Sequence, residues 1–203
     1  MQQSSTGRIA YDALVLAGGA ARRLGGADKP GLRVGESTLL VHVLAACPDA
    51  GATVVVGPVR DTAGRTVRWA REEPPGGGPV AAVAAGLPYV QAPVAVLLAA
   101  DLPFLDRPTV RRLVEALATP GPDAAVLVDA DGREQPLAAA YRTEALRAAL
   151  ADLLARSGGR PDGLPLRRLV AGLRTARLPD PGGAAYDCDT WDQVATARQR
   201  RSR

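Results

Sequence analysis

The chain has 203 residues, of which 47% are hydrophobic and 23% charged, a composition typical of one soluble globular domain and not of a disordered chain. Two cysteines and a single histidine, His42, exclude a disulfide scaffold, a multi-cysteine zinc site and a histidine-based metal centre, and they argue against a Ser-His-Asp triad. The net charge of +4 comes from scattered arginines interleaved with acidic residues, and only two Trp, four Tyr and one Phe accompany them, so nucleic-acid binding is disfavoured.

Short apolar runs alternate along the chain with small-residue or amphipathic segments, which is the pattern of strands alternating with helices. In chain order we expect a strand at 13–17, a helix from about 37 to 46, strands at 53–56 and 66–70, a small-residue helix at 79–87, a strand at 94–98, a helix at 108–117, strands at 124–128 and 137–141, helices at 144–155 and 165–173, a strand at 175–178 and a last helix from Thr190.

This alternation, with its short connections, predicts a single-domain, three-layer α/β fold around a mainly parallel sheet. We expect the domain to span residues 12–198, with a flexible tail at 1–11 and a basic tail at 199–203. In such sheets, ligands bind beyond the carboxyl ends of the strands. The residues to examine are therefore 18–29, 72–79 and Asp101.

The uncharged stretch at 78–100 is long enough to raise the question of a membrane span. Gly86, Pro88, Gln91 and Pro93 interrupt its middle, so we expect a helix, a turn and a buried strand instead. Residues 1–11 are polar and lack the apolar core of a signal peptide. We therefore expect a cytoplasmic protein with no membrane partner.

The segment from Leu16 to Pro30 leaves the first strand with four glycines, two arginines and Lys29, the only lysine among the 25 basic residues. Glycines let a backbone approach a phosphate closely, and successive N–H groups can hold an anion. A lone lysine in an arginine-rich chain indicates a place that needs a compact ammonium. The segment lacks the Walker and dinucleotide-binding patterns, and a flexible surface loop is the alternative interpretation.

This segment resembles the signature loop Leu-x-Gly-Gly-x-x-x-Arg-Met-Gly, followed by a Lys, of the MobA-like nucleotidyltransferases related to molybdenum cofactor guanylyltransferase. Leu24 stands here in place of the Met. The resemblance implies a Rossmann-like nucleotidyltransferase fold and a loop that wraps the triphosphate of a bound nucleotide. The nucleotide-binding residues implied in this segment are Leu16, Ala17, Gly18, Gly19, Arg23, Gly25 and Lys29.

The segment at 72–82 resembles the family's acidic–Gly-Pro-Leu-x-Gly segment, which lies beside the nucleoside. It implies a nucleotide-binding role for Glu72, Glu73, Gly78 and Pro79, whereas a Pro/Gly hinge is the alternative. Asp101, which follows a buried strand, resembles the Asp of the family's strand-end Asp-x-Pro, a magnesium ligand. A carboxylate at that edge of the sheet also suits a hard cation on chemical grounds, and a helix or turn cap is its alternative.

The segment at 187–194 resembles the family's late segment Asn/Asp-x-Asn/Asp-Thr-Pro-Glu-Asp-Leu, which returns polar side chains to the metal region. Asp189 is the second metal ligand that it implies, and Thr190 also fits the N-cap of the last helix. Gln135 and Pro136 match the segment that lines the acceptor side.

Three departures from the family pattern leave the donor base open. Guanylyltransferases often have Asn where Asp187 and Asp189 stand, and a second Asp also occurs in cytidylyltransferase relatives. Trp191 replaces the usual Pro, and residues 56–60 contain no Asn of the kind that some guanylyltransferases place near the nucleotide. We expect Cys47 and Cys188 to be buried, non-catalytic thiols, and His42, which lies within the apolar run 39–44, to be a helix residue and not a base.

The resemblance implies an Mg²⁺-dependent enzyme that transfers GMP from GTP to the phosphate of molybdopterin and releases pyrophosphate. Arg23, Lys29 and Asp101 are the implied catalytic residues, and Asp101 with Asp189 would hold the metal ion. The alternatives are CTP as the donor, another small phosphorylated acceptor, or a non-catalytic nucleotide-binding protein that assists molybdoenzyme maturation. A molybdoenzyme or a cofactor-biosynthesis protein is the expected protein partner.

Overall fold

The computed structural model describes residues 8–19 and 22–202, and its centre is a seven-stranded sheet in the order β5-β4-β1-β6-β8-β7-β9. Strand β8 runs antiparallel to both of its neighbours, and the other pairs are parallel, so the mainly parallel sheet is confirmed. The strands of this sheet are β1 (Tyr11–Leu16), β4 (Thr53–Val56), β5 (Arg68–Ala70), β6 (Val94–Ala99), β7 (Ala124–Val128), β8 (Glu134–Arg142) and β9 (Thr175–Pro179).

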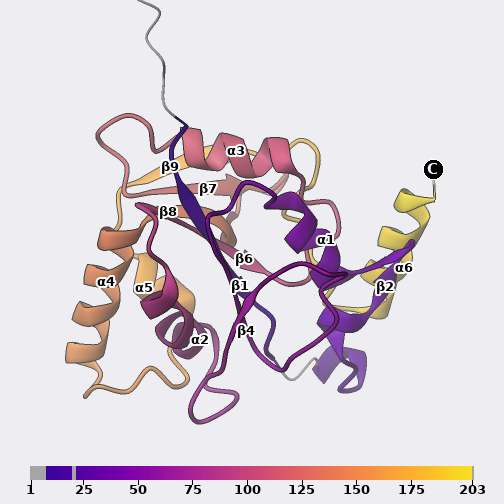
Figure 1. The fold of residues 1–203 in the computed structure, drawn as a ribbon, viewed down its shortest axis with the longest axis horizontal. Coiled ribbons are helices and arrows are strands. Elements are labelled where there is room, and N and C mark those ends of the chain that lie inside the picture. The colour runs from indigo at the N-terminus through magenta and orange to yellow at the C-terminus, as the bar shows by residue number, and fades with distance from the viewer. Residues whose placement is uncertain (1–7, 20–21, 203) are drawn as a thin grey trace, which may run out of the picture.

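Helices cover both faces of this sheet, as Figure 1 shows. One buried apolar cluster packs α2, α4 and α5 on one face, and a second packs α1 and α3 on the other. The expected three layers are therefore present. The α-helices are α1 (Leu39–Ala46), α2 (Pro79–Gly86), α3 (Arg107–Glu115), α4 (Thr143–Arg156), α5 (Leu166–Val170) and α6 (Trp191–Arg201), and short 3₁₀ turns lie at Arg22–Leu24, Lys29–Gly31 and Leu87–Tyr89.

Helix α2 lies close to the sheet because its residues are small. A Cβ atom at Gly86 would lie 2.4 Å from Cδ1 of Leu14 and 2.7 Å from Cγ2 of Val56, so only glycine fits there. The uncharged stretch that contains α2 continues through a 3₁₀ turn into the buried strand β6, as expected. Within residues 8–19 and 22–202, no helix combines the length and apolar character needed to cross a bilayer.

A third apolar cluster lies beside the sheet and joins α6 to a small hairpin of β2 (Arg33–Val34) and β3 (Ser37–Thr38). The sequence predicts that the first helix starts near residue 37, but the structure places residues 37 and 38 in this hairpin. Ser37 and Thr38 pair with the preceding strand, and the Thr38 hydroxyl then accepts the Val41 N–H at 3.3 Å, so α1 begins at Leu39. Helix α6 continues to Arg201, past the domain boundary expected at residue 198.

Candidate active site

A cleft of about 800 Å³ opens where β1 and β6 end. These strands are parallel neighbours with Leu16 opposite Ala99, so the segments that follow them leave the sheet side by side. The start of the antiparallel strand β8 reaches the same edge, since Ala138 pairs with Leu98. The cleft therefore lies at the carboxyl edge of the sheet, where ligands bind in α/β proteins.

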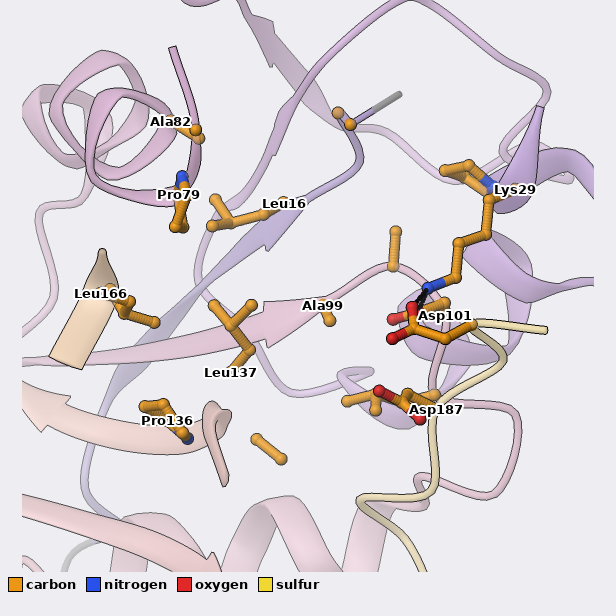
Figure 2. Close-up of a pocket in the computed structure, with 18 of the residues that line it drawn as sticks. Leu16, Lys29, Pro79, Ala82, Ala99, Asp101, Pro136, Leu137, Leu166 and Asp187 are labelled. Atoms are coloured by element: carbon orange, nitrogen blue, oxygen red, sulfur yellow. Dashed lines mark hydrogen bonds and ion pairs between the residues drawn. The ribbon is translucent and has the colours of Figure 1, made fainter. Parts of the chain in front are cut away.

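One end of the cleft is apolar and the other is charged, as Figure 2 shows. The apolar end combines side chains from β1, α2, β8 and α5, as is usual for the part of a ligand site that holds an apolar group. Its residues are Leu16, Pro79, Ala82, Pro136, Leu137 and Leu166. The charged end contains Lys29, Asp101 and Asp187, which point toward one another, together with Asp189.

The ammonium of Lys29 contacts the carboxylates of both Asp101 and Asp189. Asp101 follows β6 and is only 7% exposed, whereas Asp189 lies just before α6. Nη1 of Arg23 lies 3.7 Å from Oδ2 of Asp189, at the solvent-facing rim. The structure thus brings together all three residues expected to be catalytic, along with the expected second metal ligand.

Burial and neighbouring charges together shift the pKa values of Lys29 and Asp187 at this end of the cleft. Burial alone would lower the pKa of Lys29, but the charges and hydrogen bonds of Asp101 and Asp189 outweigh it and raise that pKa above its ordinary value. Burial, and then the negative charges of Asp189 and Asp101, raise the pKa of Asp187. The charged end therefore holds a permanent ammonium among three carboxyl groups.

The N-terminus of α6 orients Asp187, the first aspartate of the late segment. The Thr190 hydroxyl accepts the Gln193 N–H at 3.3 Å, and the Gln193 side chain accepts the Thr190 N–H at 2.8 Å, which completes a capping box. Nε2 of Gln193 also donates to Oδ1 of Asp187 at 3.2 Å. Thr190 is therefore the helix cap, and the capping group holds Asp187 as well.

Glu72 faces the cleft, whereas Glu73 is exposed and lies outside its lining. Oε2 of Glu72 accepts the Gly76 N–H at 2.8 Å, which closes a turn at the start of the segment that leads into α2. A Cβ atom at Gly18 would lie 3.3 Å from Oε1 of the same carboxylate. Gly78 caps α2 with a φ of 90°, a conformation that glycine adopts without strain.

Most of the residues expected to bind substrate line this cleft, and three of them do not. Ala17, Gly25 and Glu73 lie outside the lining. Leu166 and Ala185 line it without having been expected to, because no local pattern connects them with a site, and Leu137 lines it next to the expected Pro136. The expected residues that line it are Leu16, Gly18, Gly19, Arg23, Lys29, Glu72, Gly78, Pro79, Asp101, Gln135, Pro136 and Asp189.

Cys47, Cys188 and His42, which we do not expect to be catalytic, lie outside the lining of the cleft. Cys47 and Cys188 are free and buried, and burial raises the pKa of each thiol to about 12. Nε2 of His42 lies 2.8 Å from the Val34 carbonyl oxygen, and burial lowers the pKa of its imidazole. None of the three lines the cleft in the part of the chain that the structure describes.

The carboxylates of the charged end fit a divalent cation that is shared with a substrate. Across the described ranges, no group of three or more His, Cys, Asp or Glu side chains forms a metal cage. Asp101 and Asp189 nevertheless converge on a single positive charge, the Lys29 ammonium. Mg²⁺ is commonly held by one or two carboxylates together with phosphate oxygens and water, so this donor set suits it.

Residues 13–177 match the MobA-like NTP transferase domain family. The chain is 37% identical over 145 residues to a molybdenum cofactor guanylyltransferase of Bradyrhizobium sp. (strain ORS 278). This alignment covers 66% of this chain and 67% of that protein. The chain is 30% identical over 197 residues to a protein of the same name from Cupriavidus necator, with 92% and 96% covered.

Two solved structures share the fold. One is the molybdopterin-guanine dinucleotide biosynthesis protein A from Archaeoglobus fulgidus, with a TM-score of 0.71, 22% identity and coverage of 95% of this chain and 98% of that one. The other is the 2-C-methyl-D-erythritol 4-phosphate cytidylyltransferase from Thermus thermophilus, with a TM-score of 0.72, 22% identity and coverage of 97% and 100%. The chain belongs to the MobA-like NTP transferase family and is an enzyme of the nucleotidyltransferase class.

Proposed function

We propose that this enzyme transfers GMP from GTP to the phosphate of molybdopterin and releases pyrophosphate in an Mg²⁺-dependent reaction. The observation that carries the proposal is a single cleft with an apolar end for a ring and a charged end built from Lys29, Asp101 and Asp189. The guanylyltransferase names of the relatives support the choice of donor and acceptor.

In this reaction an oxygen of the acceptor phosphate attacks the α-phosphorus of GTP and forms a new P–O bond. The bond from that phosphorus to the oxygen bridging the α- and β-phosphates breaks, and pyrophosphate leaves with the bonding electron pair. A phosphate monoester is already ionised near pH 7, so no general base is needed. This agrees with a cleft whose described lining contains no histidine or cysteine.

The chain's own groups position and neutralise the polyphosphate. Lys29 exchanges its contacts with the two carboxylates for contacts with phosphate oxygens, Arg23 adds charge at the rim, and the Gly18 and Gly19 amides approach the phosphates. Asp101 and Asp189 would hold Mg²⁺, which supplies further neutralisation of the triphosphate charge when bound. Catalysis then comes from alignment and preorganised charge.

Glu72 supports GTP as the donor. Its buried carboxylate accepts hydrogen bonds, and guanine presents adjacent N–H donors at N1 and N2. Cytosine offers a carboxylate only its N4 amino group, beside the N3 lone pair that the carboxylate repels, so it can form one such hydrogen bond where guanine forms two. We place the acceptor against Gln135 and Pro136, where the Gln135 amide is held by a 2.7 Å hydrogen bond to Oδ2 of Asp129.

Pyrophosphate release tests the proposal most directly. We expect release with GTP and Mg²⁺ that depends on molybdopterin, and little release with ATP, UTP or CTP. Turnover with CTP and none with GTP would replace the donor with CTP, the second candidate, which the aspartates at 187 and 189 favour. Pyrophosphate release from GTP with another phosphorylated acceptor, but not with molybdopterin, would overturn the assignment of molybdopterin as the acceptor.

Two neighbouring carboxylates give a matched test of the donor assignment. Glu72→Gln replaces one acceptor oxygen by an N–H donor and should lower the preference for GTP over CTP by about tenfold or more. Glu73→Gln makes the same change on an exposed side chain outside the cleft and should leave that preference unchanged. Equal selectivity in the two variants would remove Glu72 from base recognition.

We also propose that the dinucleotide product passes to a molybdoenzyme or to a cofactor-biosynthesis protein in the cytoplasm. This part of the proposal rests on the family relationship and on the composition of the sequence. Co-purification of the enzyme with a molybdoenzyme from cells grown on molybdate tests it, and reproducible absence of any such protein would contradict it.

A further inference from the structure

Arg60 lies outside the cleft, in the connection between β4 and β5, and its guanidinium bridges three chain segments. Its Nε donates to both carboxylate oxygens of Asp28, at 2.8 and 3.0 Å, and its Nη2 lies 2.6 Å from Oδ1 of the same group. Its Nη1 donates to the carbonyl oxygens of Ala17 at 3.1 Å and Pro58 at 2.9 Å.

These partners stand at the two ends of the glycine-rich segment. Ala17 directly precedes the Gly18-Gly19 pair, and Asp28 directly precedes Lys29. Arg60 therefore joins the backbone that leads into the glycine pair to the residue next to the catalytic ammonium. A separate contact tightens the first of these junctions, since Gly57 lies so close to Ala17 that a Cβ atom there would be 2.7 Å from the Ala17 carbonyl oxygen.

Burial and geometry make this bridge rigid. The Arg60 side chain is only 16% exposed, and its hydrogen bonds use three different nitrogens in the fixed fork of a guanidinium. A lysine ammonium at this position is a point charge and cannot hold a carboxylate by two nitrogens while donating to two carbonyl groups in the same plane. The charge on Arg60 is therefore less important than its shape.

We propose that Arg60 is a positioning residue for nucleotidyl transfer: acting through Asp28 and Ala17, it holds Lys29 and the Gly18-Gly19 amides at the separation that a triphosphate requires. The inference rests on the proposed function, because it assigns Lys29 and these amides to the phosphates of the donor. It goes beyond that function by naming a residue outside the cleft lining that acts through other residues.

A residue that only stabilised the fold would weaken the binding of every ligand in proportion to the folded fraction. A residue that positions the phosphate-binding groups has a different signature, because its loss should affect GTP more than GMP, which lacks the β- and γ-phosphates. Its effect should also become smaller when Lys29 is already absent, since only the Gly18-Gly19 amides then remain for it to position.

The experiment measures Kd for GTP and for GMP by titration calorimetry, and kcat and KM for GTP, in the wild type, in four single variants, and in Lys29→Met with and without Arg60→Gln. Arg60→Gln removes the fork, Arg60→Lys keeps the charge, and Asp28→Asn changes an exposed partner without a change of shape. Arg65→Gln makes the same Arg-to-Gln change at an exposed position of the same connection and serves as the control. The Kd and KM values of all variants are compared at a temperature at which thermal unfolding shows that each variant is folded to the same extent.

We expect Arg60→Gln, Arg60→Lys and Asp28→Asn each to raise Kd and KM for GTP about tenfold and Kd for GMP less than threefold, with Arg65→Gln unchanged. In a Lys29→Met background, Arg60→Gln should add a change of less than about fivefold, because only its contact with Ala17 still serves the phosphates. If Arg60→Gln does not fold, Asp28→Asn, whose side chain is exposed, carries the test.

Two failures are distinguishable. If Arg60→Gln and Asp28→Asn bind GTP as tightly as the wild type does, this inference is overturned and the proposed function is not. Equal losses for GTP and GMP, or full rescue by Arg60→Lys, overturn it as well. A wild-type protein that binds and turns over no nucleoside triphosphate overturns the proposed function and this inference with it.

Discussion

The ammonium of Lys29 forms an ion pair with Asp101, and this contact joins the segment after β1 to the segment after β6 at the charged end of the cleft. The chain otherwise uses arginine for its basic side chains. A compact ammonium fits between the carboxylates of Asp101 and Asp189, whereas a planar guanidinium is wider and would displace one of them. The single lysine is explained by this geometry.

The first prediction separates the shape of Lys29 from its charge. Lys29→Arg keeps the charge and should still lower kcat/KM for GTP by about 100-fold, close to the loss in Lys29→Met, because the preorganised ammonium is gone in both. Steady-state pyrophosphate release measures the loss, and thermal unfolding confirms that the variants fold. Wild-type turnover by Lys29→Arg would show that a positive charge of either shape is sufficient.

The second prediction concerns Asp101. Asp101→Asn removes the charge but keeps the size of the side chain, so GTP should still bind while turnover falls about 100-fold or more. Asp152→Asn makes the same change on an exposed residue of α4 and should retain full turnover. Calorimetry for binding and pyrophosphate release for turnover distinguish the two effects. Unchanged turnover in Asp101→Asn would remove Asp101 from the reaction.

Much of this site could be predicted from local sequence. Asp101 ends a run of apolar residues that forms a buried strand, and in a parallel sheet the residue after such a strand faces the ligand edge. Lys29 is marked by its glycine-rich surroundings and by being the only lysine. Both signals come from residues that are adjacent in the sequence, so a local sequence pattern is sufficient to detect them.

Other features depend on contacts between distant segments, which no local pattern contains. Arg60 contacts Asp28 and Ala17 across 32 and 43 residues, and in sequence it is one arginine among many. The choice between Glu72 and Glu73 is made by the Gly76 N–H, which holds one of two adjacent carboxylates toward the cleft. The β2–β3 hairpin has strands of only two residues, too short for an alternating pattern to show.

The third prediction tests the close approach of Gly57 to the first glycine pair. In Gly57→Ala the new Cβ atom would lie 2.7 Å from the carbonyl oxygen and 2.8 Å from the carbonyl carbon of Ala17, and backbone cannot move aside as a side chain can. The variant should lose about 2–3 kcal/mol of unfolding free energy and raise KM for GTP.

Gly64→Ala is the matched control for this substitution. Gly64 lies in the same connection and also has a positive φ, of 76°, but a Cβ atom there would have no neighbour within 4 Å. This variant should lose only about 1 kcal/mol, the strain of the left-handed conformation, and should bind GTP normally. Urea unfolding and steady-state kinetics measure both quantities, and equal KM values in the two variants would contradict the link to Ala17.

The last prediction concerns stability in acid, away from the cleft. Nε and Nη2 of Arg174 donate to the carboxylate of Asp123 at 2.9 and 2.8 Å and tie the loop before β9 to the start of β7. The hydrogen bonds from Arg174 lower the pKa of Asp123 from its ordinary value of 3.8 to about 2.

Because the folded state holds this carboxyl group in its charged form, the pair stabilises the fold fully above the ordinary pKa, and the contribution is lost as pH falls toward 2. The difference in unfolding free energy between the wild type and Asp123→Asn should therefore be constant from pH 7 to about 5 and shrink between about pH 4 and 2. Arg174→Gln removes the other partner and should show the same dependence in urea titrations. A difference that stays constant down to pH 2 would mean that the charge of Asp123 does not stabilise the folded state, and that its oxygens act only as neutral acceptors joining the two strands.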